Sequence, residues 1–285
     1  MLSQKSYVRS SLKIVLAVVV LALGVVGNLS FAVQAAPAPS KIIHAQTSIP
    51  DNLIKRVGFG PNGEWLILYG TNGYSSDGLA APVLTNLAKI NDANEEIQWM
   101  AFGPAGAYLL SSAKSFYSDK LPTDMDAEIN RLIAAGNGND IKFAAFAPTP
   151  GTGSATSDPT ASGWVIIWGK NGYTEVGLPK SATDEIDKLN TDNKEIKQLT
   201  FDSNGEWLIV YGDNGLIWST GVVQPLVDQL KKLNDAGEVI RQVEFVPDTG
   251  AGIGWVVLYG TDKVVGQNLP SGFVDEMKKL DPTLQ

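Results

Sequence analysis

The sequence predicts an α/β repeat protein in which five ββ(β)α units of about 44 residues close into a five-bladed, propeller-like ring. Three observations lead to this prediction. Similar Ile-to-Phe segments recur at spacings of 43, 44, 55 and 44 residues, Asn-Gly pairs separate short apolar segments, and an amphipathic stretch ends each copy. The expected units span residues 54–96, 97–140, 141–195, 196–239 and 240–285.

The first element of each unit is expected to be a strand followed by a tight turn. In the fourth unit, residues 196–201 place Leu199 and Phe201 on one strand face, and Asn204-Gly205 supplies the positive φ that such a turn needs. The run from Asp202 to Gly205 matches only part of a calcium-binding loop, and turn chemistry explains it better.

The second element is a strand with apolar residues on both faces, as in residues 65–69, which predicts burial on both sides. Two aromatic positions recur and are expected to fill the core. They are Trp65, Trp164, Trp207 and Trp255 in the second strand, and Phe59, Phe102, Phe146, Phe201 and Phe245 at the end of the first.

A second turn and a short third strand precede a helix of about 10–12 residues. Leu226, Leu230 and Leu233 form its apolar stripe in the fourth unit, and a helix this short is expected to pack on its own sheet. Ser181 with Asp184 matches a capping box at the start of the third helix.

Units this small cannot bury their faces alone, so they form either a closed ring or an open solenoid. The terminal copies carry no polar capping changes, which favours the ring. In repeat number, unit length and element order, residues 54–285 resemble the five-fold α/β-propeller of the pentein superfamily. Guanidine-modifying penteins use a cysteine and a histidine, which these repeats lack, so no catalytic residue is implied. Five-bladed lectin propellers of the tachylectin kind are a second architectural neighbour, without the helix.

Composition excludes several functions. The 285 residues contain no cysteine and one histidine, His44, so thiol chemistry, an imidazole metal cage and a Ser-His triad in the repeats are all excluded. A net charge of −8 argues against nucleic-acid binding. We therefore expect no catalytic residues, no metal site and no cofactor, and we expect a monomer.

Residues 1–35 resemble a signal peptide, since Lys5, Arg9 and Lys13 precede an apolar run and small residues precede a cleavage site after Ala35. Residues 36–53 would be a linker. The alternative is an uncleaved leader that anchors the chain, which would be its one contact with a membrane. Either way, the prediction is a secreted or cell-envelope protein.

Candidate binding residues come from aromatic side chains after the second turn and from the copy that departs most from the repeat. They are Tyr74, Lys114, Tyr117, Tyr173 and Trp218. A ring just after a turn can stack on a sugar or anchor a peptide. An insertion at residues 149–162 in the third copy is either a binding loop or a tolerated insertion.

These observations predict an exported, non-catalytic binding protein. Its partner is either a carbohydrate, bound in a lectin-like manner, or an envelope protein for which the ring is an interaction scaffold. A glycoside hydrolase that uses two carboxylates is a more distant alternative.

Overall fold

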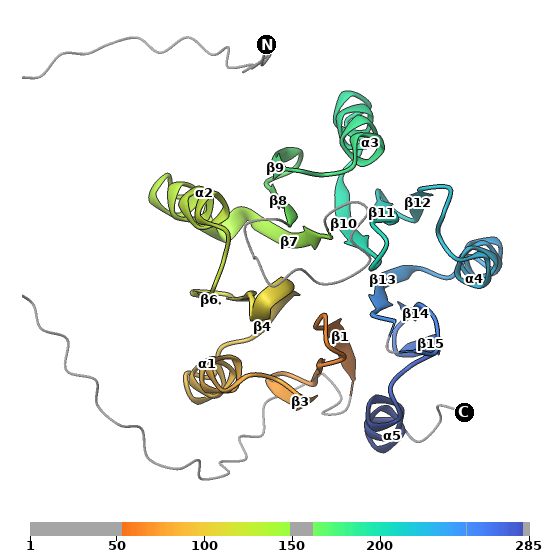
Figure 1. The fold of residues 1–285 in the computed structure, drawn as a ribbon, viewed down its shortest axis with the longest axis horizontal. Coiled ribbons are helices and arrows are strands. Elements are labelled where there is room, and N and C mark those ends of the chain that lie inside the picture. The colour runs from red at the N-terminus through yellow and green to blue at the C-terminus, as the bar shows by residue number, and fades with distance from the viewer. Residues whose placement is uncertain (1–52, 149–161, 249, 282–285) are drawn as a thin grey trace, which may run out of the picture. The chain divides into compact units, whose positions relative to one another are not determined.

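The computed structural model describes residues 53–148, 162–248 and 250–281, and it contains five similar units (Figure 1). Each unit is a three-stranded antiparallel sheet followed by a helix, so the predicted repeat is confirmed. The expected signal peptide, nearly all of the linker and most of the 149–162 insertion lie outside the described residues. Within the described ranges, no helix is long and apolar enough to cross a bilayer.

The elements occupy equivalent places in the five units. The inner strands are β1 (Ile54–Phe59), β4 (Ile97–Phe102), β7 (Ile141–Ala147), β10 (Ile196–Phe201) and β13 (Ile240–Val246). The middle strands are β2 (Trp65–Tyr69), β5 (Tyr108–Ser112), β8 (Gly163–Trp168), β11 (Trp207–Tyr211) and β14 (Gly254–Tyr259). The outer strands are β3 (Gly73–Asp77), β6 (Phe116–Asp119), β9 (Gly172–Val176), β12 (Gly215–Trp218) and β15 (Lys263–Gln267). The helices are α1 (Ala81–Asp92), α2 (Thr123–Ala134), α3 (Lys180–Thr191), α4 (Gln224–Asp235) and α5 (Ser271–Leu280), and two short 3-10 turns are η1 (Pro104–Gly106) and η2 (Gly138–Asp140).

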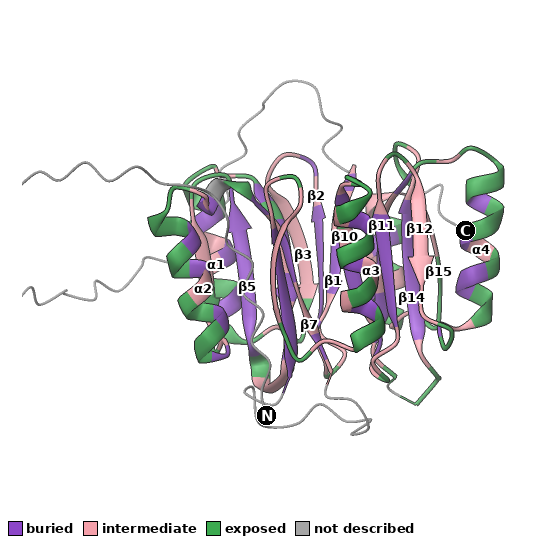
Figure 2. Ribbon diagram, turned by 90° about the horizontal axis from the view of Figure 1, so that it is seen from above, coloured by how far each residue is buried: buried purple, intermediate pink, exposed green. Residues whose placement is uncertain are grey.

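The inner strands lie nearest to one another, and the helices lie farthest from them (Figure 1). Each inner strand forms a hairpin with its middle strand, as in the pairing of Phe201 with Trp207. Gly205 in the connecting turn has φ 86°, and the Asp202 carboxylate accepts hydrogen bonds from the Asn204 and Glu206 amides, so turn chemistry does explain this segment. The middle strands are buried on both faces, as predicted (Figure 2).

The helices pack differently from the prediction, because each one also contacts the sheet of the following unit. Val83 and Leu87 of α1 share a buried cluster with Tyr108 of β5. The Trp164 indole donates to Asp124 Oδ1 of α2 at 3.1 Å. The expected capping box at Ser181 is wrong, since Pro179 is the N-cap of α3 and the Ser181 hydroxyl accepts from the Trp207 indole of the next unit.

The same arrangement joins the fifth unit to the first. Phe273 of α5 is fully buried, and its ring centroid lies 5.0 Å from that of Phe59 and 5.7 Å from that of Trp65. The Gln242 side chain of β13 donates to the carbonyl of Val57 in β1 at 2.7 Å and accepts from its amide at 3.0 Å. The Gln242 side chain therefore links two inner strands through residues 185 positions apart in the chain.

The two sets of repeated aromatic residues have different environments. All four equivalent Trp side chains are buried, which confirms the prediction for them. The prediction is wrong for four of the five Phe residues, because only Phe245 is buried and the others are partly exposed. The physical reason is that the inner strands end around a cavity, so the space beside these rings is only partly filled by protein.

Candidate functional site

A cavity of about 200 Å³ lies among the inner strands, and all five strands contribute to its wall. The second halves of the strands and the turns that follow them line it. All five repeated Phe residues belong to this wall, which explains why every one except Phe245 is partly exposed. They are Phe59, Phe102, Phe146, Phe201 and Phe245. We refer to this space as the central cavity.

One side of the central cavity is polar and comes from β1, β10 and β13. Glu244 Oε1 accepts hydrogen bonds from Gln198 Nε2 at 2.8 Å and from Gln242 Nε2 at 2.9 Å, and Glu244 Oε2 accepts from the Thr200 hydroxyl at 3.2 Å. Gln198 Nε2 also donates to the carbonyl of Val243, and Gln198 Oε1 accepts from the Val243 amide, as Gln242 does with Val57. The two glutamines therefore hold the carboxyl group and the strand edges in one network.

Burial raises the pKa of Glu244 to about 7, although the hydrogen bonds from Gln242, Thr200 and Gln198 and the charge of Arg56 act in the opposite direction. Glu244 is partly buried and lines the cavity. A carboxyl group that titrates near neutral pH in a cavity is typical of functional sites.

Arg56 is the second charged group in this wall. Burial lowers the pKa of its guanidinium group, as does the nearby charge of Arg241, while Glu244 and Glu96 raise it. Arg56 makes no hydrogen bond and no ion pair with any described residue. Arg56 is partly buried, and the five donors of its guanidinium group have no partner among the described residues. Such a group is unusual, because partial desolvation is normally compensated by direct partners.

The opposite side of the central cavity is apolar and comes from β4 and β7. Trp99, Phe143, Ala144 and Ala145 contribute to it. The Trp99 indole donates to the carbonyl of Ile141 at 3.1 Å, so its polar atom is satisfied within the wall. The cavity is therefore two-sided, with charged and amide groups facing an apolar surface.

A wider space of about 970 Å³ lies at the beginning of the inner strands, and Arg56, Trp99 and Lys197 line both spaces. We call it the charged opening, because six basic and three acidic side chains line it. They are Lys55, Arg56, Lys142, Lys170, Lys197 and Arg241, and Glu96, Asp140 and Glu195.

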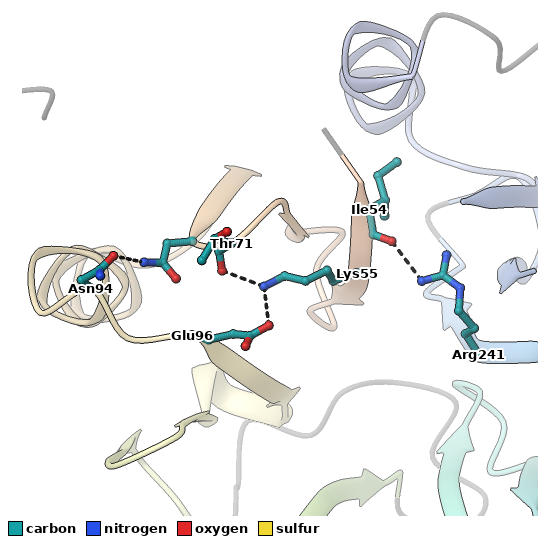
Figure 3. A network of polar contacts seen from close by, with 7 residues as sticks. Ile54, Lys55, Thr71, Asn94, Glu96 and Arg241 are labelled. Atoms are coloured by element: carbon teal, nitrogen blue, oxygen red, sulfur yellow. Dashed lines mark hydrogen bonds and ion pairs between the residues drawn. The ribbon is translucent and has the colours of Figure 1, made fainter. Parts of the chain in front are cut away.

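Ion pairs satisfy only part of this charge. Lys55 Nζ lies 2.8 Å from Glu96 and donates to the carbonyl of Thr71 (Figure 3). Lys142 pairs with Glu195. Arg241 Nη1 donates to the carbonyl of Ile54 at 3.1 Å, but its Nε and Nη2 atoms are buried without a partner among the described residues. The opening therefore carries excess positive charge in a chain whose net charge is −8.

The structure places the predicted binding residues on separate units and does not bring them into one site. Tyr74, Tyr117, Tyr173 and Trp218 lie on the outer strands β3, β6, β9 and β12, and each is partly exposed and packed against a buried cluster. Lys114 is exposed in the turn before β6. Only Lys114 and Tyr117 share a unit.

Trp218 is not equivalent to the three tyrosines. Tyr173 pairs with Ile167 of β8. The residue of β11 that corresponds to Ile167 is Val210, and it pairs with Leu216, so Leu216 is the equivalent of Tyr173. Trp218 lies two residues farther along the strand, opposite Leu208. It is therefore on the same strand face as Leu216. The Tyr173 hydroxyl donates to Asp187 of α3 in its own unit, a contact that stabilises the unit itself.

We expect Tyr173→Phe to lower the free energy of unfolding by about 1 kcal/mol, because it removes a hydrogen bond to a carboxylate. Tyr74→Phe is the matched control, since that hydroxyl makes no hydrogen bond with a described residue, and its effect should be close to zero. Urea denaturation measures both. Equal effects would contradict a structural role for the Tyr173 hydroxyl.

Arg56, Gln198, Gln242 and Glu244 were not among the site residues predicted from the sequence. A signal was present, since these residues occupy the third and fifth places of inner strands, where the second and third units have apolar residues. Those apolar residues are Trp99, Ala101, Phe143 and Ala145. A polar residue there breaks the repeat at a position expected to be buried, which marks a site as clearly as an exposed ring does.

Among the described residues, no three acidic, histidine or cysteine side chains are grouped to hold a metal ion. Comparison of the sequence with models of protein families gives no match, and comparison with curated proteins gives none either.

Proposed function

We propose that this chain is an exported, non-catalytic binding protein that takes a small ligand into its central cavity. One observation carries the proposal. Every inner strand contributes to the cavity wall, and Arg56 faces it without a hydrogen-bonding partner among the described residues. A partly buried group with unused donors is well placed for a ligand or ordered water to complete its hydrogen bonds.

The proposal includes closure of the five units into an α/β-propeller that is similar to penteins in architecture. The Gln242–Val57 hydrogen bonds and the packing of Phe273 against the first unit support closure, because they repeat contacts made between successive units. Closure would enclose the cavity on all sides by equivalent strands and fix the distance between its polar and apolar walls.

The proposed absence of catalysis rests on the groups in the wall. Glu244 is held by three side-chain donors, which suits it to a fixed electrostatic role. A hydrolase of the two-carboxylate kind needs a second acid across the substrate. The other carboxylate in the wall is Asp202, whose Oδ1 is committed to the turn amides of Asn204 and Glu206.

Export is part of the proposal and rests on the charged and apolar pattern of residues 1–35. A carbohydrate ligand at the post-turn aromatics remains the alternative, but their separation on four outer strands favours the central cavity. An envelope partner protein would bind elsewhere on the surface.

The test is a ligand-observed NMR screen of the full-length protein against small neutral, anionic and cationic molecules, with Ala145→Trp as the variant. We expect binders that Ala145→Trp eliminates, because the indole fills the cavity. Ala134→Trp, at the exposed end of α2, is the matched control and should bind as the wild type does. Binders unaffected by Ala145→Trp, or glycan binding weakened by Tyr173→Ala and Trp218→Ala, would contradict the central cavity as the site.

A further inference from the structure

We propose that the ligand of the central cavity is a small organic carboxylate whose charged group binds Arg56 and whose apolar body lies against Trp99, Phe143 and Ala145. This inference rests on the proposed function and names the class of ligand. It follows from three features of the cavity, which concern charge, shape and access.

Arg56 supplies the positive charge that a ligand would pair with. Its guanidinium group lines the cavity and makes no direct contact with Glu244, whose oxygens are occupied by Gln198, Gln242 and Thr200. The planar guanidinium fork matches a carboxylate, which accepts two parallel hydrogen bonds from it. A carboxylate would therefore supply the partner that the protein itself does not.

The ligand should carry a single negative charge. Glu244 lies in the same wall and interacts electrostatically with Arg56, so it already offsets part of the positive charge. A dianion would face repulsion from Glu244 whenever that carboxyl group is ionised, whereas a monocarboxylate balances the charge that remains on Arg56. Burying an anion is favourable only when it is paired and hydrogen-bonded.

The apolar side of the cavity suits a ring. The wall formed by β4 and β7 offers an indole, a phenyl ring and alanine side chains, and the five repeated Phe residues line the cavity farther along the strands. A cavity of about 200 Å³ has room for one aromatic ring, since an apolar cavity of about 150 Å³ holds benzene. A ring joined to a carboxylate matches both sides of the cavity.

Access favours anions as well. The charged opening shares Arg56, Trp99 and Lys197 with the central cavity and has six basic side chains against three acidic ones. Arg241 in its wall retains two buried nitrogen atoms without partners among the described residues. The positive charge of this opening raises the local concentration of anions and their rate of entry, even on a protein of negative net charge.

The experiment compares 4-fluorobenzoate with 4-fluorobenzamide, which have the same shape but differ in charge, by fluorine NMR with the full-length protein. We expect the carboxylate to bind at least about tenfold more tightly than the amide, because the amide gains no charge-assisted hydrogen bonds. Arg56→Met should weaken carboxylate binding by about tenfold or more and leave amide binding unchanged. Arg131→Met removes the same charge from the exposed surface of α2 and should have no effect.

Each outcome decides the matter. Equal binding of the two probes, or an equal loss in Arg56→Met and Arg131→Met, would overturn the carboxylate assignment while leaving the central cavity as a binding site. The same holds if neither probe binds but neutral molecules in the screen do. If no molecule of any charge binds, the proposed function fails together with this inference. Should Arg56→Met fail to fold, Arg56→Lys and the comparison of probes on the wild type still provide the test.

Discussion

Phe273→Ala should lower the free energy of unfolding by about 3–5 kcal/mol, the range expected for removing a fully buried phenyl ring. The ring is 0% exposed and contacts Phe59 and Trp65, which belong to the opposite end of the repeat array. The cost includes the lost transfer of the ring from water and the cavity left in a cluster that joins two units. Urea denaturation followed by tryptophan fluorescence measures it.

The matched control is Phe116→Ala on β6. Phe116 is partly exposed, and its ring lies 6.1 Å from Trp99. Its removal should cost less than half as much, because less apolar surface returns to water. If Phe273→Ala is no more destabilising than Phe116→Ala, the contact between α5 and the first unit does not hold the array together, and closure of the ring loses its main support.

Glu244→Gln should remove a pH-dependent loss of stability of about 3 kcal/mol. The folded protein holds this carboxyl with a pKa of about 7, against an ordinary value of 4.5. Between these values the folded chain keeps a proton that the unfolded chain has released. The free energy of unfolding of the wild type therefore falls as pH rises from about 4.5 to about 7, and the penalty is fully present above pH 7.

A glutamine preserves the network around this position. Its oxygen can accept from Gln198 and Gln242, and its amide can donate to Thr200, while Arg56 is the charged group that faces it. We expect the stability of the variant relative to wild type to rise by about 3 kcal/mol between pH 4 and pH 8. Urea denaturation at several pH values measures this difference.

Glu185→Gln on α3 provides the comparison, since it removes a partly exposed carboxylate paired with Lys188. Its effect should stay within about 0.5 kcal/mol across the same range. A stability difference for Glu244→Gln that does not change with pH would show that this carboxyl is ionised as readily in the folded chain as in the unfolded one.

The repeat architecture could be predicted because its signals are local. Alternation in the strands, the glycine of the first turn and the spacing of Leu226, Leu230 and Leu233 each specify backbone geometry within a few residues. The five units, their element order and the burial of the repeated Trp residues therefore follow from the sequence alone.

The partners of each element could not be predicted in the same way. A helix with one apolar stripe can pack on its own sheet, on the next sheet or between the two, and periodicity does not distinguish these cases. In the structure α5 covers Trp65 of the first unit, and the Trp207 indole binds Ser181 of the preceding one. Such contacts join residues remote in the chain, so no local pattern encodes them.

The same distinction applies to the site. The sequence by itself determined that any binding surface would be made from repeated strands, without cysteine and with a single histidine, and it pointed to aromatic residues beside the turns. Only the tertiary structure decided that the inner strands meet around a cavity and that Arg56, Gln242 and Glu244 face it together. The reason is physical, because a polar residue in a strand is exposed or buried according to what packs against it, and here that is the neighbouring inner strand on each side.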